Sequence, residues 1–322
     1  MKRTTFFSSL LVAALGIVMA TPASATTFTW VGDSTADGSD WQEPSNWNLN
    51  SSYPQSGDTA IIVSPAFLKQ DPVIYQQAEA VSVLNIQNGG LLTVTTQTLT
   101  VSGSAGVDID AGGTLDIGAS GVVIVSGGGG THPIGGTLKL SSSTSILKVS
   151  AATTFGLNGD DKGMVLGQHN DAKIDIAGVT LTNNIFVEGM MTVREESGDA
   201  TFLNGSTGVV RANAAGTLKF ASGLTLDDTS ACSPSWEAIT SSAILEFNEA
   251  ATSLVGTFVL DNCAKMLFNA NITTVGKLVD SAASSPKGFI DIENSSTFAF
   301  RTLCDSGSPV SYNSDQTLGS CP

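Results

Sequence analysis

Two neighbouring aspartates are the residues in this sequence best suited to catalysis. Asp160 and Asp161 lie in the segment Asn158-Gly-Asp-Asp, and His169 follows shortly after them. A hydrolase that inverts a glycosidic bond uses two carboxyl groups about 6.5–9.5 Å apart, one as acid and one as base. Asn, Gly and Asp also favour surface turns. We therefore expect a turn here, and catalysis by Asp160, Asp161 and His169 is the alternative hypothesis.

A second group of carboxylates has the chemistry to bind calcium. Asp108 and Asp110 alternate along one segment, and Asp116 lies on the next segment after Ala111-Gly-Gly. Calcium takes six to eight oxygen ligands, but the Gly-Gly-x-Gly-x-Asp order of calcium-binding nonapeptide repeats is missing. We expect ordinary solvent-facing carboxylates, with calcium as the alternative. The sequence indicates no other cofactor.

Four cysteines, Cys232, Cys263, Cys304 and Cys321, lie in the last third of the chain. An even number of cysteines in an exported protein predicts disulfides, because an oxidising compartment lets them persist. Proximity in the sequence favours Cys232–Cys263 and Cys304–Cys321, although four cysteines permit three pairings. Zinc binding is not indicated, since there is no Cys-x-x-Cys motif.

The amino-terminal segment, 1–25, predicts export. Lys2 and Arg3 precede an apolar run over positions 6–20, and Ala23-Ser-Ala25 provides a small-x-small cleavage site. The apolar run is shorter than the roughly 20 residues of a membrane span. We expect cleavage after Ala25, no membrane span afterwards, and a secreted, extracellular or cell-surface location, with the periplasm as an alternative. A formal net charge of −15 argues against nucleic-acid partners, which require clustered cations.

Short alternating segments must position these groups. Six such segments begin at positions 83, 91, 98, 107, 114 and 122. The first and fourth, the second and fifth, and the third and sixth are separated by nearly the same interval, about 24 residues, which is typical of a repeat architecture. This period predicts three strands per turn in a three-sided coil. A glycine run at positions 127–130 precedes His132 and predicts a loop excursion between two turns.

The alternation within each segment assigns the two sides of every strand. One set is predicted to point inward: Leu84, Ile86, Leu92, Val94, Leu99, Val101, Leu115, Ile117, Leu138, Leu140, Leu218, Phe220, Leu245, Phe247, Ile290 and Ile292. The charged residues fall on the outward phase, which is predicted to face solvent: Asp116, Lys139, Asp175, Lys219, Glu246 and Asp291.

The segment 27–63 carries a resemblance to a known family. The order Trp30-x-Gly, Asp40-Trp41, Asn46-Trp47, Tyr53-Pro and Asp58-x-Ala-Ile is similar to the amino-terminal start of secreted bacterial β-helix proteins, including autotransporter-type passenger domains. The resemblance implies a right-handed parallel β-helix with end caps. It leaves activity open, because such passengers include adhesins, stalks and enzymes.

Enzymes with a related fold carry motifs that can be sought in this sequence. Polygalacturonase-like enzymes of related fold carry a paired Asp, a further Asp, a Gly-His-Gly and an Arg-x-Lys, and only the paired Asp matches here.

We expect Trp30, Trp41 and Trp47 to plug the open end of the coil, and stacking of these indoles on a carbohydrate is the alternative.

The predicted organisation is a signal peptide (1–25), an amino-terminal cap and first coil (26–80), a regular β-helix (81–230), and degenerate coils with a disulfide-bonded cap (231–322). The expected function is a non-catalytic structural or adhesive scaffold that contacts carbohydrate or a host or cell surface. Two alternatives remain: a polysaccharide lyase or glycoside hydrolase, and a fibre subunit that self-associates head to tail through its ends.

Overall fold

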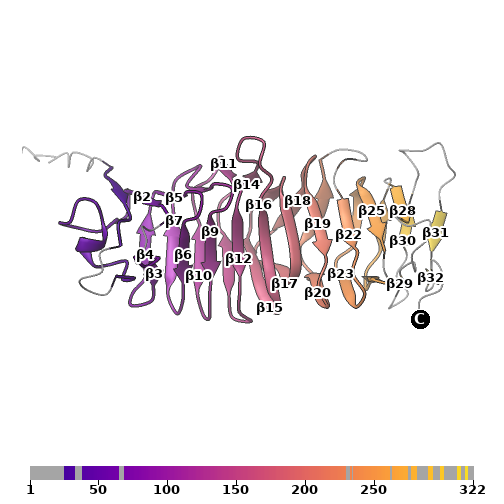
Figure 1. Cartoon of the computed structure of the whole chain (residues 1–322). Coiled ribbons are helices and arrows are strands. Elements are labelled where there is room, and N and C mark those ends of the chain that lie inside the picture. The colour runs from indigo at the N-terminus through magenta and orange to yellow at the C-terminus, as the bar shows by residue number, and fades with distance from the viewer. Residues whose placement is uncertain are drawn as a thin grey trace, which may run out of the picture.

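The computed structural model describes residues 25–32, 38–64, 69–229, 233, 235–261, 263–274, 277–280, 289–292, 298–300, 310–312 and 316–317. The chain is nearly all β, with one short 3-10 helix, η1 (Pro44–Asn46), in the described part. Parallel strands stack into a β-solenoid of about nine turns with about 24 residues per turn. Figure 1 shows these turns side by side in one elongated body. The predicted solenoid is therefore confirmed.

The strands form three faces. Face 1 contains β1 (Thr27–Thr29), β2 (Thr59–Ile62), β5 (Val83–Ile86), β8 (Val107–Ile109), β11 (Thr131–Pro133), β14 (Thr153–Gly156), β16 (Thr180–Asn183), β18 (Thr201–Asn204), β21 (Thr225–Asp228), β24 (Ala251–Leu254), β27 (Ile272–Thr274) and β30 (Phe298–Phe300). Face 2 contains β3 (Val73–Ile74), β6 (Leu91–Val94), β9 (Thr114–Ile117), β12 (Thr137–Leu140), the first parts of β15 (Met164–Ala177) and β17 (Phe186–Ser197), then β19 (Val209–Ala212), β22 (Ser235–Ala238), β25 (Thr257–Leu260) and β28 (Lys277–Asp280). Face 3 contains β4 (Glu79–Val81), β7 (Thr98–Val101), β10 (Val122–Val125), β13 (Ile146–Val149), the second parts of β15 and β17, then β20 (Gly216–Phe220), β23 (Ala243–Phe247), β26 (Lys265–Phe268) and β29 (Phe289–Ile292).

Residues of equal phase stack from turn to turn. Thr98 pairs with Val122, and Val122 pairs with Ile146, so β7, β10 and β13 are in register. The inward residues predicted from alternation are buried, except that Ile292 is only partly buried against the core. The stacked apolar side chains form one continuous core along the solenoid, and its burial is the main favourable contribution to folding.

The corners between faces differ in length although the faces stay in register. Ile146 pairs with Lys173 across a long interval of chain, whereas Lys173 pairs with Thr192 across a much shorter one. Since the paired strands still stack directly, the corners contain the extra or missing residues.

Two strands bend across a corner. The first part of β15 pairs with β12 and its second part with β13, so one strand serves faces 2 and 3. At the bend in this ladder, a Cβ on Gly167 would lie 2.3 Å from the Met190 carbonyl oxygen, and Gly189 has a φ of +95°. Both positions require glycine. Asp175, one of the predicted outward residues, therefore lies on a strand much longer than the predicted segments.

Two predicted placements are wrong. The sequence predicts a loop at His132, but this residue lies on β11, points into the core and is fully buried. Asp175 takes the predicted outward phase, but it is only 3% exposed because the guanidinium of Arg194 covers it. The two guanidinium contacts, of 2.6 and 2.9 Å, form a bidentate pair.

Both ends of the solenoid carry antiparallel pairings. At the amino-terminal end, Trp47 bridges Trp30 and the Asn48 amide donates to the Thr29 carbonyl at 3.0 Å, which covers the outer edge of β1. At the other end, β31 (Val310–Tyr312) pairs antiparallel with β30, and β32 (Gln316–Thr317) with β29. Antiparallel strands across the last turn cover edges that would otherwise pair with another chain.

Candidate functional site

The paired aspartates and the histidine do not form one site. Asn158 and Asp161 close a tight turn through reciprocal backbone hydrogen bonds of 3.1 and 3.0 Å, and both Asp160 and Asp161 are exposed. His169 lies at the far end of the face-2 part of β15. At about 3.3 Å per residue, β15 places His169 roughly 17 Å from Met164, and the turn with Asp161 lies before Met164. The expected turn is observed, and His169 lies outside the hydrogen-bond reach that an acid–base partner of these aspartates would need.

The three candidate calcium ligands are also divided. Asp108 and Asp110 lie together, and the Asn158 side-chain amide donates to both carboxylates at 3.0 Å. Asp116 is on face 2, where it pairs with Lys139 at 3.5 Å. The described residues contain no group of three or more His, Cys, Asp or Glu side chains that could hold a metal ion.

The environment of Asp108 shifts the pKa of its carboxyl group. Burial raises its pKa and the nearby Asp110 adds to the rise, whereas hydrogen bonds from Asn85 and Asn158 oppose it. The amides therefore stabilise the charged form of Asp108 in place of a cation.

The three amino-terminal tryptophans are core residues. Trp30, Trp41 and Trp47 are at most 1% exposed, and the Trp47 ring packs edge-on against the other two at centroid distances of 5.1 and 4.7 Å. The Trp47 indole donates to the Trp41 carbonyl at 2.7 Å. These indoles plug the end of the coil as expected, and the alternative of direct carbohydrate stacking is wrong because no ring face reaches solvent.

Of the four cysteines, only Cys263 lies in the described part of the chain, where it follows β25. Cys232, Cys304 and Cys321 fall outside it. The disulfides and their pairing stay a prediction.

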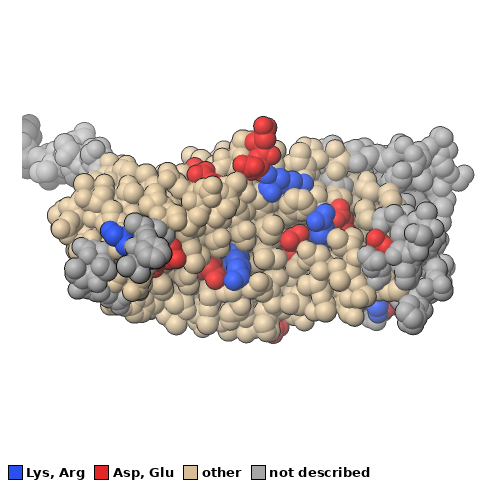
Figure 2. Space-filling view, in the orientation of Figure 1, with Lys and Arg blue, Asp and Glu red and all other residues tan. Residues whose placement is uncertain are grey.

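Much of the surface charge is used in pairs between adjacent turns. Ion pairs join Lys139 to Asp116, Arg194 to Asp175, Arg211 to Glu237, Lys219 to Glu246, and Lys265 to Asp291. Figure 2 shows the same pattern as blue and red groups side by side on a largely uncharged surface. The solvent-exposed pairs among them contribute about 0–1 kcal/mol each, and all five tie neighbouring turns without forming an extended patch of one sign.

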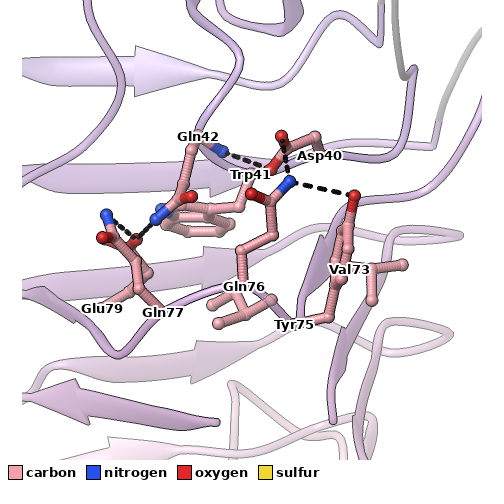
Figure 3. A pocket seen from close by; sticks show the side chains of 9 residues that line it. Asp40, Trp41, Gln42, Val73, Tyr75, Gln76, Gln77 and Glu79 are labelled. Atoms are coloured by element: carbon pink, nitrogen blue, oxygen red, sulfur yellow. Dashed lines mark hydrogen bonds between the residues drawn. The ribbon is translucent and has the colours of Figure 1, made fainter. Parts of the chain in front are cut away.

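A polar hollow lies at the amino-terminal end of the solenoid, beside β3 and β4. Figure 3 shows the side chains around it. They are Asp40, Trp41, Gln42, Val73, Ile74, Tyr75, Gln76, Gln77 and Glu79, and they pack so closely that no space for a water molecule is left between them. The segment that carries the first three is held over β3, because the Trp41 amide donates to the Val73 carbonyl at 3.4 Å and the Val73 amide to the Ser39 carbonyl at 2.7 Å.

Hydrogen bonds connect the polar groups around the hollow. The Gln76 amide donates to Asp40 Oδ2 at 2.8 Å and to the Tyr75 hydroxyl at 3.1 Å. On the other side, Gln42 donates to Glu79 Oε1 at 2.5 Å and Gln77 to the same oxygen at 3.3 Å. Burial raises the pKa of Glu79, and the two amides oppose that rise.

This site is not apparent from the sequence alone. The sequence signal for it was the run Tyr75-Gln-Gln-Ala-Glu79. This run is mostly polar, whereas the neighbouring strands have an apolar residue at every second position. The partner side chains, Asp40 and Gln42, come from a separate segment just before η1. Only the fold brings the two segments together.

Comparisons of the chain with protein-family models, with curated proteins and with solved structures found no match. The similarity to autotransporter-type passengers therefore stays a prediction, whereas the solenoid itself is established by the strand pairings. No helix among the described residues is long and apolar enough to cross a membrane.

Proposed function

We propose that this chain is a non-catalytic secreted or cell-surface rod that serves as a structural or adhesive scaffold. The observation that carries the proposal is the unbroken ladder of inward side chains over about nine turns. Each turn is hydrogen-bonded to the next along faces 2 and 3, and face 1 adds three separate stretches of paired strands, so the body resists bending and holds its two ends about 43 Å apart, at about 4.8 Å per turn.

The placement of the acidic residues supports the non-catalytic part. Asp116 is in an ion pair, Asp108 and Asp110 accept hydrogen bonds from one asparagine, and Asp161 is far from His169. The carboxylates that suggested chemistry are thus separate or already occupied by structural partners.

The export part is tested by locating the full chain in a bacterial host. An epitope inserted between Gly159 and Asp160 leaves the strands intact, because this exposed turn lies outside every ladder. We expect a mature amino terminus at Thr26 and an epitope that antibodies reach on intact cells or in the medium. An uncleaved protein retained in the cytoplasm would overturn this part of the proposal.

The scaffold part is tested by deleting the gene and measuring cell attachment and matrix cohesion. We expect a loss that the wild-type chain restores and that the double variant Asp160→Ala/Asp161→Ala restores equally. Turnover of polyuronates, with or without calcium, that the wild type supports and the double variant lacks would instead establish an enzyme.

A further inference from the structure

The sequence contains a single Asp-Pro bond, between Asp71 and Pro72, directly before β3. The nitrogen of an X-Pro bond belongs to a tertiary amide and carries no hydrogen. The carboxyl group of Asp71 can reach the carbonyl carbon of its own residue through a five-membered ring. The attacking group and the bond to be broken are therefore held together by the covalent structure itself, which favours the reaction.

The carboxyl group of Asp71 lacks the polar partners that a buried carboxyl group normally has. Its Oδ1 is buried, and no hydrogen bond or ion pair among the described residues involves either of its oxygens. Asp116 also has a buried oxygen without a partner, but its second oxygen faces Lys139 at 3.5 Å. Buried polar atoms nearly always have a partner, so each exception requires an explanation, and a catalytic role is one.

The environment also favours the protonated form of this carboxyl group. Burial raises the pKa of Asp71 above its usual value of 3.8, because water no longer stabilises the charge and no donor replaces it. A protonated carboxyl group provides both an oxygen that can attack a carbonyl and a proton for the departing nitrogen. The nitrogen in question belongs to Pro72, which is itself buried.

The backbone is anchored on both sides of the bond, whereas the carbonyl to be attacked is free. Before the bond, the Gln70 carbonyl accepts a hydrogen bond from the Trp30 indole at 2.9 Å. After it, the Pro72 carbonyl accepts from the Thr93 amide at 3.0 Å. The Asp71 carbonyl accepts no hydrogen bond within the described part of the chain. It can therefore become tetrahedral without the loss of a hydrogen bond.

We propose that the folded chain cleaves itself between Asp71 and Pro72. One carboxyl oxygen of Asp71 attacks the carbonyl carbon of the same residue, and the carboxyl proton passes to the Pro72 nitrogen as the C–N bond breaks. Water then opens the cyclic anhydride that has formed at Asp71. The products are one chain that ends in the free carboxyl groups of Asp71 and a second chain that begins with the secondary amine of Pro72.

The two products remain parts of one solenoid. β2, in the first product, pairs with β5, in the second, along its whole length. Across the break, the Val73 amide donates to the Ser39 carbonyl at 2.7 Å, and the Trp41 amide donates to the Val73 carbonyl at 3.4 Å. Cleavage therefore yields a two-chain rod whose amino-terminal end is held by hydrogen bonds and packing alone. This inference is independent of the proposed scaffold function.

The test follows the purified full chain in buffer at about pH 5 with protease inhibitors, by denaturing electrophoresis and mass spectrometry. We expect a fragment that begins Pro72-Val-Ile, formed at a first-order rate that does not depend on protein concentration. The chain unfolded in urea at the same pH should be cleaved at least tenfold more slowly, because its Asp71 is ionised and no longer buried. A folded chain that stays intact, or equal cleavage in urea, overturns the proposal.

Variants assign the reaction to the two residues. Asp71→Asn removes the carboxyl group, Asp71→Glu enlarges the ring of the anhydride, and Pro72→Ala replaces the tertiary amide, so each should slow cleavage at least tenfold. Asp160→Asn, at an exposed turn, should be cleaved at the wild-type rate. Urea unfolding curves establish that each variant is folded. Cleavage of Asp71→Asn at the wild-type rate would identify a contaminating protease and overturn the proposal.

Size-exclusion chromatography tests the two-chain product. After cleavage, the fragments should elute together at the volume of the intact chain and should separate only in urea. Separate elution without urea would overturn the two-chain rod, whereas the cleavage itself is judged by the rates in the variants.

Discussion

At the scale of single residues, the solenoid buries a few polar side chains whose charge depends on pH. His132 on β11 accepts a hydrogen bond from the Val107 amide at its Nδ1, at 3.0 Å, and its ring packs edge-on near Phe155. Burial lowers the pKa of His132 to about 4. The neutral ring is compatible with this position, and the imidazolium is not.

His132 should therefore make the protein sensitive to acid. The unfolded chain takes up a proton near pH 6.5 and the folded chain only near pH 4, so stability is full above pH 6.5 and falls as the pH drops towards 4. We expect this residue to contribute a loss of about 3 kcal/mol between pH 7 and pH 4. Urea unfolding at both pH values measures the loss.

The matched variants for this prediction are at the two histidines in the sequence. His132→Gln keeps an acceptor for the Val107 amide and should remove the acid-dependent loss, whereas His169→Gln, at an exposed site, should behave as the wild type. An equal loss in His132→Gln and in the wild type would contradict the assignment.

The effect of Asp228 on stability depends on pH in the opposite direction. It continues a buried ladder after Asn183 and Asn204, and it accepts hydrogen bonds from the Gly256 amide at 2.8 Å and the Trp236 indole at 3.1 Å. Burial raises the pKa of Asp228 to about 7, because these donors only partly replace the lost water.

The raised pKa predicts that Asp228 destabilises the fold in alkaline solution. The folded carboxyl stays protonated up to about pH 7 while the unfolded one ionises near pH 4, so stability falls as the pH rises between these values. Asp228→Asn should remove that fall and stabilise the protein at pH 8 by up to about 4 kcal/mol, with little effect at pH 4. The variant Asp199→Asn, at an exposed position, should keep the wild-type dependence, and thermal unfolding across this range tests both variants.

At the scale of elements, the core changes character along the rod. Aliphatic ladders fill the first turns, and aromatic ladders follow: Phe220, Phe247 and Phe268 stack on β20, β23 and β26 at centroid distances of 5.8 and 5.2 Å. Aromatic pairs add roughly 0.5–1.5 kcal/mol beyond the burial of their area. The middle ring, Phe247, contacts both neighbours.

Substitution of Phe247 should therefore destabilise the fold far more than substitution of Glu246, its neighbour on the same strand. Phe247→Ala should lower the free energy of unfolding by about 3–5 kcal/mol, because the cavity lies between two rings. Glu246→Ala, which removes an outward ion pair with Lys219, should cost at most about 1 kcal/mol. Urea unfolding measures the free energy of unfolding of both variants. Similar losses would contradict the assignment of Phe247 to the inward phase and of Glu246 to the outward phase.

The sequence predicted these elements where the alternation is regular and missed them where a corner or a buried polar group interrupts it. Leu115 and Ile117 could be assigned to the core because their strand alternates and the next turn repeats the pattern at Leu138. His132 and Asn183 could not, because polar residues at inward positions resemble loops until their hydrogen-bond partners in adjacent turns are known. The hollow was missed for the same reason, since its two polar segments meet only in the fold.

At the scale of the whole molecule, the ends decide whether rods remain separate. The head-to-tail alternative requires open strand edges, but β31 and β32 cross the last turn antiparallel to β30 and β29. The amino-terminal end carries the bridge between Trp30 and Trp47. We therefore expect the mature chain to remain a monomeric rod.

Removing the carboxy-terminal cover should convert the rod into a polymer. A chain that ends after Phe300 lacks β31 and β32, so the edges of β29 and β30 become available for pairing with another copy. Sedimentation and electron microscopy at rising concentration should reveal oligomers or fibres for this variant only. The full chain with Cys304→Ser and Cys321→Ser separates loss of the strands from loss of a predicted disulfide, and it should stay monomeric. A truncated chain that is monomeric throughout would contradict this role of the cap.

The unequal corners have a consequence for how such a chain can change over generations. Insertions and deletions at a corner alter the length of one turn but leave the stacking of the faces intact, as the long interval from Ile146 to Lys173 and the short one from Lys173 to Thr192 already demonstrate. Relatives can therefore diverge in length and lose a recognisable period while keeping the same rod, so kinship is better traced by the register of the faces than by aligned sequence.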